Sequence, residues 1–319
     1  MTKLRLTIQH NYRIFEPPIE SGVKIEWERT GSPGKLTFTT VKMMHEDMSF
    51  GEGDQVCFYY NGALLFVGYV FTKKRDKEHR IEVTCYDQLR YLKNKYSYVF
   101  ENKRADQIVT ALAQDFNLQT GVIEKTGYII PAIGKENISA MDISLDAIDE
   151  TLLNNGRMFV LYDDCGKLSL RNVTHMVSEQ LIFEGSAENF DYTSSIDSET
   201  YNSIVLYYKD ENDAMQVYTA SNKAKIQEWG TLRYFEEVKN PTIGKEKAKS
   251  LLSLYCKKTR ELQVTGAFGD ISVRGGTLVP VKLYLGDINV NNYLLVEKVT
   301  HTFENDHHTM DLTLEGAWE

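Results

Sequence analysis

The 319-residue chain has little proline, few cysteines and no long apolar run. Its 6 prolines and the lack of low-complexity tracts argue against long disordered linkers. No stretch of about 18 apolar residues occurs, so no transmembrane helix and no membrane insertion are expected. The four cysteines, Cys57, Cys85, Cys165 and Cys256, are far apart and form no C-x-x-C pair, which disfavours a zinc ribbon. We expect them to be reduced in a chain that folds in cytoplasm.

The chain also lacks an excess of basic residues, since its formal net charge is −9 and its pI is near 5.4. Proteins that bind nucleic acid need a basic face to displace counterions, so specific binding to nucleic acid is not expected. The first 18 residues alternate polar and apolar side chains and contain no signal-peptide core. They predict a strand rather than an export signal.

Known catalytic motifs are missing as well. The sequence contains no G-x-S-x-G elbow, no phosphate-binding P-loop and no H-E-x-x-H zinc motif. The segment 51–56, GEGDQV, is not a dinucleotide fingerprint, because it lacks the third glycine and leads into a strand-like run. No cofactor is therefore expected, and structural or binding roles are favoured over catalysis.

What is present is an ordinary globular composition, 42% hydrophobic and 25% charged, long enough for two or three cores of roughly 100 to 150 residues each. Up to about residue 97 the side chains alternate with a period of two. The runs that predict strands are 3–9, 22–28, 34–43, 54–60, 63–71 and 80–87. Such short, evenly spaced strands predict a small barrel or sandwich. Asn61-Gly62 matches a two-residue type I′ hairpin turn.

The period then changes to that of helices. One apolar stripe is formed by Ala105, Ile108, Val109, Leu112 and Phe116. A second stripe is formed by Leu145, Ile148 and Leu152. Ser139 is placed to cap this second helix and Gly156 to end it. A hairpin that turns at residues 163–166 follows, so we expect a compact α+β module over residues 98–184.

The last third, residues 185–319, is again rich in strands. We expect a hairpin around residues 211–213 and one amphipathic helix near 244–259, with Thr242 as its cap. The later strand candidates are 261–268, 277–285, 292–303 and 308–316. The predicted fold class is therefore mixed α+β and β-rich, with β modules at residues 1–97 and 185–319 on either side of the α+β module.

A dense group of imidazoles and carboxylates lies at residues 299–312, VTHTFENDHHTMDL. If Phe303 pairs with His308 across a turn, His301 and His308 lie on the apolar face of a hairpin, while Asp311 points to the other face. A metal site needs three or four converging ligands, and only His301 and His308 can converge easily. An aromatic-lined hairpin is the favoured interpretation, with a metal site at His301 and His308 the less favoured one.

A second group of carboxylates follows one helical stripe at Asp142, Asp146 and Asp149, with Glu150 beside it. A glycosidase needs two carboxylates on either side of a cleft. Three carboxylates on one helix face are more often a solvated face. We treat the three aspartates as candidate interaction residues.

The segment 72–80, TKKRDKEHR, is the main basic stretch and includes Lys73, Lys74 and Arg75. It lies between two predicted strands, so the plain interpretation is a solvated hairpin loop, because charged tips protect sheet edges.

The segments GYVFTKKRD (68–76), VTCYDQLRYLKNKYSYVFENK (83–103) and MFVLYDDCGKLSLRN (158–172) resemble a known family. They are similar to the YqbQ/XkdQ family of baseplate hub proteins, found in PBSX-like prophages and related phage-tail bacteriocins. The resemblance covers residues 32–172. The stretch 266–283, GAFGDISVRGGTLVPVKL, also resembles the second tube domain of such hubs, less specifically.

The resemblance implies a structural, non-enzymatic hub with two small β-barrel, tube-type domains, in which a homotrimer joins the hexameric tail tube to the trimeric spike around a channel. It implies as partners a tail tube or tube-initiator protein, a spike protein, a LysM-type tail protein and baseplate wedge proteins. It places the chain in a virion or phage-tail-like particle that is assembled in the bacterial host cytoplasm. The basic segment 72–80 would then contact a neighbouring tail protein, and part of the acidic excess would line the channel.

Two other classes of function stay open. One is a tail-associated peptidoglycan hydrolase that uses Asp142, Asp146 or Glu150. The other is a host- or carbohydrate-binding module that uses some of the 19 tyrosines. Exposed aromatic platforms would favour that module, whereas the position of the tyrosines within strand patterns favours their use in cores and interfaces.

Overall fold

A computed structural model describes residues 4–41, 49–197, 199–210, 214–238, 240–286, 289–304 and 307–316. Strands account for 53% and helices for 20%, which confirms the predicted β-rich α+β class. The chain forms two compact units, one of Met1–Asp191 with Leu262–Glu319 and the other of Tyr192–Glu261. In the described part of the chain, no helix is both long and apolar enough to span a membrane.

The N-terminal part of the larger unit is an antiparallel sheet, which we call the first lobe. Its strands are β1 (Leu4–His10), β2 (Arg13–Phe15), β3 (Ile19–Glu28), β4 (Lys35–Val41), β5 (Gln55–Tyr60), β6 (Ala63–Arg75) and β7 (Arg80–Tyr86), paired in the order β3-β4-β7-β6-β5-β1-β2. Alternate side chains are buried, as the period of two predicted. Asn61 and Gly62 have φ of 50° and 84°, as the predicted type I′ turn between β5 and β6 requires.

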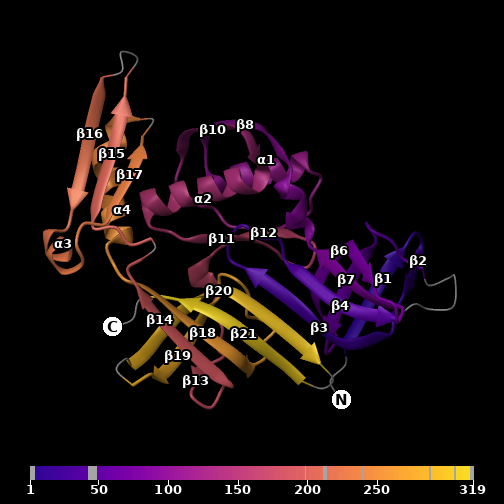
Figure 1. Cartoon of the computed structure of the whole chain (residues 1–319). Helices are drawn as coiled ribbons and strands as arrows, with labels where there is room; N and C mark the ends of the chain where they lie inside the picture. Colours follow the sequence, from indigo (N-terminus) through magenta and orange to yellow (C-terminus); the bar gives the residue numbers. More distant parts are fainter. Residues whose placement is uncertain are drawn as a thin grey trace. The chain divides into compact units, whose positions relative to one another are not determined.

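Helices α1 and α2 belong to a middle module between the end of β7 and residue 175 (Figure 1). Its elements are η2 (Gln88–Lys93), β8 (Lys95–Lys103), α1 (Ala105–Asp115), β9 (Thr120–Ile123), β10 (Ile130–Ser139), α2 (Ala140–Asn155), β11 (Phe159–Asp163), β12 (Leu168–Asn172) and η3 (Val173–His175). Both predicted helices and the β11–β12 hairpin are confirmed. Apolar side chains of α1, α2, β11 and β12 form one buried core.

The predicted ends of α2 are confirmed, but its buried face is shifted. The Ser139 hydroxyl accepts the Asp142 backbone N–H at 3.0 Å, and Gly156 has a φ of 71°. Leu145 and Leu152 are only half-buried. The fully buried side chains of this helix are Ala140, Met141, Ile143, Ser144, Ala147, Ile148 and Thr151. The small side chains on this face let α2 pack closely against the core. The hydroxyls of Ser144 and Thr151 donate hydrogen bonds to backbone carbonyl oxygens one turn earlier in the helix.

The second lobe consists of β13 (Ile182–Phe183), β14 (Asn189–Ser195), β18 (Thr259–Phe268), β19 (Leu278–Tyr284), β20 (Asn289–Glu304) and β21 (His307–Glu315). The long strand β20 pairs with β19 through its first half, and with β21 and β3 through its second half. The two lobes therefore share one continuous sheet. Among the described residues the strand pairs form an open, branched path and close no ring, so an arrangement as two closed barrels is not confirmed.

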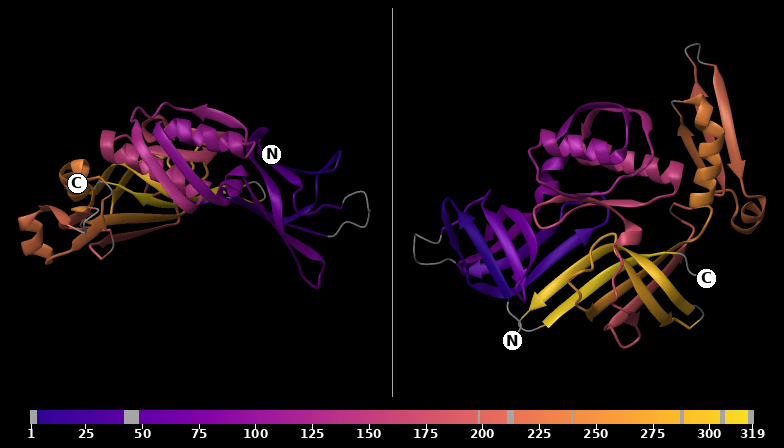
Figure 2. Two further views of the ribbon diagram at one scale, coloured as in Figure 1. Left: turned by 90° about the horizontal axis from the view of Figure 1, so that it is seen from above. Right: turned by 180° about the vertical axis from the view of Figure 1, so that it is seen from behind.

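The smaller unit contains β15 (Ser203–Lys209), β16 (Met215–Ser221), α3 (Lys223–Trp229), β17 (Arg233–Glu237), η4 (Pro241–Ile243) and α4 (Gly244–Tyr255). The β15–β16 hairpin is confirmed; its predicted tip, residues 211–213, lies outside the described residues. Helix α4 packs against β15 and β16 (Figure 2). The prediction that Thr242 caps this helix is wrong. Asn240 accepts the Thr242 backbone N–H, and the resulting 3-10 turn leads directly into α4.

Candidate functional site

The histidine-rich hairpin is β20 followed by β21, and its predicted register is confirmed. Phe303 pairs with His308 and His301 with Met310. His301 Nδ1 lies 2.9 Å from His308 Nε2, and His301 Nε2 lies 2.8 Å from the carbonyl oxygen of Val273. Because a carbonyl only accepts, His301 donates from Nε2, and its Nδ1 accepts the His308 N–H. The described residues contain no group of three or more candidate metal ligands.

These side chains pack the second lobe onto the first. The Phe303 ring lies 5.1 Å from that of Phe58 and 5.0 Å from that of Tyr60, centre to centre. His301 meets the Trp27 ring edge-on at 5.2 Å. The same residues lie where β20 pairs with β3, since His301 is opposite Ile25 and Phe303 opposite Val23. The hairpin is therefore a structural joint between the two lobes.

Burial keeps this histidine pair neutral. Burial, followed by the neighbouring His308, lowers the pKa of His301 to about 3, while the hydrogen bond to Val273 opposes the shift. Burial also lowers the pKa of His308 to about 4. Neither ring is suited to exchange protons near pH 7 as a general base would.

The predicted acidic stripe lies on α2. Asp142 and Asp149 are exposed, and Asp146 is half-buried with its carboxylate 2.6 Å from the Lys135 ammonium. The pKa of Asp149 is raised, first by partial desolvation and then by the Asp146 carboxylate. None of these residues, nor Glu150, lines either of the two pockets that we describe. They form a charged helix face.

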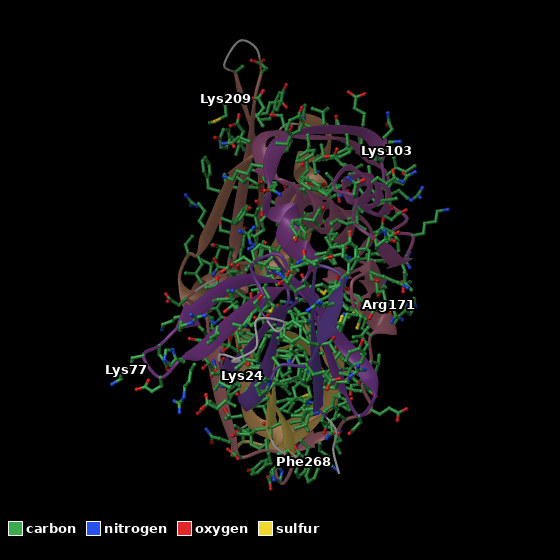
Figure 3. All side chains as sticks on the ribbon, turned by 90° about the vertical axis from the view of Figure 1, so that its right-hand side faces the viewer. Lys24, Lys77, Lys103, Arg171, Lys209 and Phe268 are labelled. Carbon is green, nitrogen blue, oxygen red and sulfur yellow. The ribbon has the colours of Figure 1, made fainter. Side chains whose placement is uncertain are left out.

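The basic segment 72–80 is mostly strand, whereas a hairpin loop was predicted. Lys73, Lys74 and Arg75 belong to β6, which continues to pair with β7 as far as Arg75, and only residues 76–79 turn. Figure 3 shows Lys77 at the outer end of this hairpin, pointing away from the protein. The Lys73 ammonium donates to the Phe50 carbonyl oxygen at 2.5 Å and lies over the Phe50 ring. Lys74 is 4.0 Å from Glu82 and well exposed.

Sequence reasoning missed a buried pair of carboxyl groups, Asp87 and Asp163. Asp87 is 2% exposed and Asp163 is 4% exposed. Asp87 accepts the backbone N–H groups of Gly34 and Leu89, at 2.8 and 3.0 Å. Asp163 Oδ1 accepts the Gly166 N–H at 2.7 Å, whereas its Oδ2 is buried and accepts no hydrogen bond of good geometry within the described residues.

The pKa values of both carboxyls are raised. Burial is the main cause for both, and it raises the pKa of Asp163 to about 6; the Asp163 charge adds to the rise at Asp87. The nearby cation is Arg274, whose guanidinium lies over the rings of Trp27 and Tyr162 at 4.8 and 4.3 Å and donates to the Asp163 carbonyl oxygen. Asp87 and Asp163 are far apart in the sequence. The only sequence signal for their burial was their position at the ends of predicted strands with alternating apolar side chains.

The arginine stack borders a pocket of about 300 Å³ at which three parts of the larger unit meet. The first lobe contributes Trp27, Leu64 and Leu65, and the middle module contributes Tyr162, Arg171 and His175 among others. The loop between β18 and β19 contributes Ile271, Ser272 and Arg274. Arg171 and His175 both contact the Glu124 carboxylate, so the polar groups of this wall are paired with one another.

Comparison with known proteins gives consistent matches along the chain. A family model described as YQBQ-like matches residues 23–315. Protein YqbQ of Bacillus subtilis (strain 168) is 32% identical over 303 residues, covering 92% of this chain and 91% of that protein. The phage-like element PBSX protein XkdQ of the same organism is 31% identical with the same coverage.

A solved structure has a similar fold. The 43 kDa tail protein of prophage MuSo2 from Shewanella oneidensis superimposes with a TM-score of 0.73, covering 97% of this chain and 98% of that chain. Its sequence identity is 12%, so this likeness concerns the fold.

Proposed function

Because this chain belongs to the YQBQ-like family, we propose that it is the structural hub in the baseplate of a contractile phage tail or tail-like particle. In this role it is a homotrimer that joins a hexameric tail tube to a trimeric spike around a central channel. The names of its relatives, a PBSX-element protein and a prophage tail protein, support a structural part in a tail.

The observation that carries this proposal is the sheet shared by the two β lobes. β3 and β20 pair over six residues on each strand, from Lys298 with Glu28 to Phe303 with Val23. The rings of Trp27 and Phe58, which contact His301 and Phe303, pack beside this strand pairing. Two lobes held in this way can present two similar surfaces from one chain. Three chains would then offer six such surfaces to a sixfold tube and three to a spike.

The role proposed for each part of the chain follows the modules predicted from the sequence. Residues 1–97 and 185–319 would supply the tube-type parts, with residues 98–184 as the α+β module between them. The expected neighbours are a tube or tube-initiator protein, the spike, a LysM-type tail protein and wedge proteins. The charged β6–β7 hairpin protrudes with Lys74 and Lys77 at its exposed end. It would contact a neighbouring tail protein through these charges.

The acidic charge of the chain suits a channel wall. With a net charge of −9, carboxylates facing the bore would repel a passing phosphate backbone rather than retain it. A bore lined mainly by lysine and arginine in the assembled particle would refute this part of the proposal.

A hydrolase remains the second candidate, and the structure offers it little support. The acidic residues on α2 lie along one helix face, and Asp146 is neutralised by Lys135. Glycoside hydrolysis needs an acid and a second carboxylate on opposite sides of a substrate. Purified protein is expected to leave the turbidity of a peptidoglycan suspension unchanged, and a loss of turbidity that Asp146→Asn abolishes would favour the enzyme instead.

The experiment that tests the structural role is deletion and complementation. Particles from cells that lack this chain should contain no tube attached to a baseplate, and the wild-type gene should restore complete tails. Complete tails in the deletion strain would refute the proposal.

A further inference from the structure

A charged pocket of about 440 Å³ lies on the first lobe. It is lined by Glu26, Glu28, Ser32, Pro33, Lys35, Tyr86, Arg90 and Lys93. These residues come from β3, β4, the end of β7, the 3-10 turn η2 and the turn between β3 and β4. We call it the Arg90 pocket.

The acidic side chains of the Arg90 pocket are already paired. The Glu26 carboxylate lies 2.8 Å from the Lys35 ammonium and 3.8 Å from that of Lys298. Glu28 accepts the Ser32 hydroxyl at 2.6 Å and lies 3.1 Å from Lys298. Hydrogen bonding from Ser32, followed by Lys298, lowers the pKa of Glu28. Both carboxylates of the pocket therefore have partners within the chain.

Two cations in the same pocket have no such partner. Among the described residues, no carboxylate or other acceptor lies within hydrogen-bond or ion-pair distance of the Arg90 guanidinium or the Lys93 ammonium. Arg90 is half-buried and is held over the Phe71 ring at 5.5 Å, which fixes its planar donor group in place. Lys93 is exposed and only weakly attracts Glu28. The pocket therefore carries an uncompensated positive charge.

Half-buried aromatic rings continue from this pocket across the outer face of β6 and β7. Phe71 meets Tyr86 at 5.5 Å and Tyr91 at 6.1 Å, and Tyr91 meets Tyr69 at 5.8 Å, centre to centre. Tyrosine and arginine are enriched among the residues that contribute most to protein–protein binding. A preorganised arginine beside such rings is suited to bidentate binding of a carboxylate.

We propose that the Arg90 pocket binds an aspartate or glutamate carboxylate on a segment of another tail protein. This inference rests on the proposed tail function, because it requires a neighbouring protein. The carboxylates of Glu26 and Glu28 in the same pocket would repel a polyphosphate chain, whereas a peptide can place a single carboxylate on Arg90. The rings of Tyr86 and Phe71 would then pack against the flanking residues of that segment.

Carbodiimide cross-linking of intact particles tests the proposal, because this reagent joins an amine to a carboxylate only at contact distance. Lys93 is expected to be joined to an aspartate or glutamate of another tail protein. The double variant Arg90→Glu/Lys93→Glu is expected to enter particles about tenfold less or worse. The conservative variant Arg90→Lys/Lys93→Arg should retain most of the incorporation.

The matched control is Lys95→Glu/Lys103→Glu, which makes the same charge change at exposed positions of β8. It should be incorporated like the wild type, and all variants should unfold at the wild-type urea midpoint. Either the lack of a link from Lys93 to another chain or normal incorporation of Arg90→Glu/Lys93→Glu overturns the proposal. Binding of the purified chain to a DNA oligonucleotide that the same variant abolishes would assign the pocket to phosphate and overturn it too. If the wild-type chain is absent from particles, the proposed tail function fails instead.

Discussion

Asparagine in place of Asp163 is expected to stabilise the protein at neutral pH, although it removes a hydrogen-bonding carboxylate from a buried site. Asp163 lies beside Asp87 in the interior, and its Oδ2 lacks a good donor. An asparagine keeps Oδ1 as the acceptor for Gly166 N–H. Its uncharged amide in the place of Oδ2 removes the repulsion that the Asp163 charge exerts on Asp87.

The size of the effect follows from the raised pKa. The folded-state pKa of Asp163 is about 6 and its ordinary value is 3.8. The folded state therefore holds a proton over this range that the unfolded state has lost, and stability falls as the pH rises through it. At roughly 1.36 kcal/mol per pH unit, the ionised Asp163 costs the folded state about 3 kcal/mol above pH 6.

Urea unfolding of the wild type and of Asp163→Asn between pH 3.5 and pH 8 measures this cost. The stability difference should be small at the acidic end and should reach about 3 kcal/mol in favour of asparagine above pH 6. Asp87→Asn is the contrasting variant. Both Asp87 oxygens accept backbone N–H groups, so this change should lower stability by about 1–3 kcal/mol. A pH-independent difference for Asp163→Asn would refute the reasoning.

Four further predictions concern the joint between the lobes, the basic hairpin and a helix end. Phe303→Ala should lower the free energy of unfolding by about 3–5 kcal/mol, because the ring is 1% exposed and packs on Phe58 and Tyr60; a loss under about 1 kcal/mol would contradict this. His301→Leu should reduce the loss of stability that the wild type undergoes as the pH drops from 6.5 toward 3. In that range the unfolded state binds a proton at His301 that the folded state does not, because the folded-state pKa is lowered from 6.5 to about 3. An unchanged pH dependence of the free energy of unfolding, measured in urea, would count against this prediction. Lys73→Glu/Lys74→Glu should impair tail assembly in electron micrographs but cost the isolated chain no more than about 1 kcal/mol, because Lys74 is exposed and Lys73 is half-buried with one hydrogen bond, to the Phe50 carbonyl. Gly156→Ala should cost roughly 1–2 kcal/mol in the same unfolding assay, because φ is 71° there although space for a Cβ is open.

Much of the local structure could be predicted from the sequence. Alternation placed the strands of the first lobe, and an assumed pairing of Phe303 with His308 placed His301 on the buried face. These features depend on neighbours within a hairpin, where register and turn chemistry decide the outcome. The caps of α2 were equally local, since Ser139 and Gly156 act on backbone groups within a few residues.

The rest depended on contacts between distant residues. Nothing in the alternation of β20 indicated that one half would pair with β19 and the other with β3. The extension of β6 to Arg75 was missed because charged residues on a protruding hairpin alternate too weakly to be read as a strand. Asp87 looked like the end of a strand and Asp163 like a turn residue, and only the fold brings both beside Arg274.

Electron cryomicroscopy of purified particles, reconstructed at the baseplate without imposed symmetry, tests the central claim most directly. The account predicts three copies of this chain around a threefold axis and an open bore, with both β lobes of each copy facing the tail tube. Six copies in that layer, or three copies in which only one lobe of each reaches the tube, would contradict it.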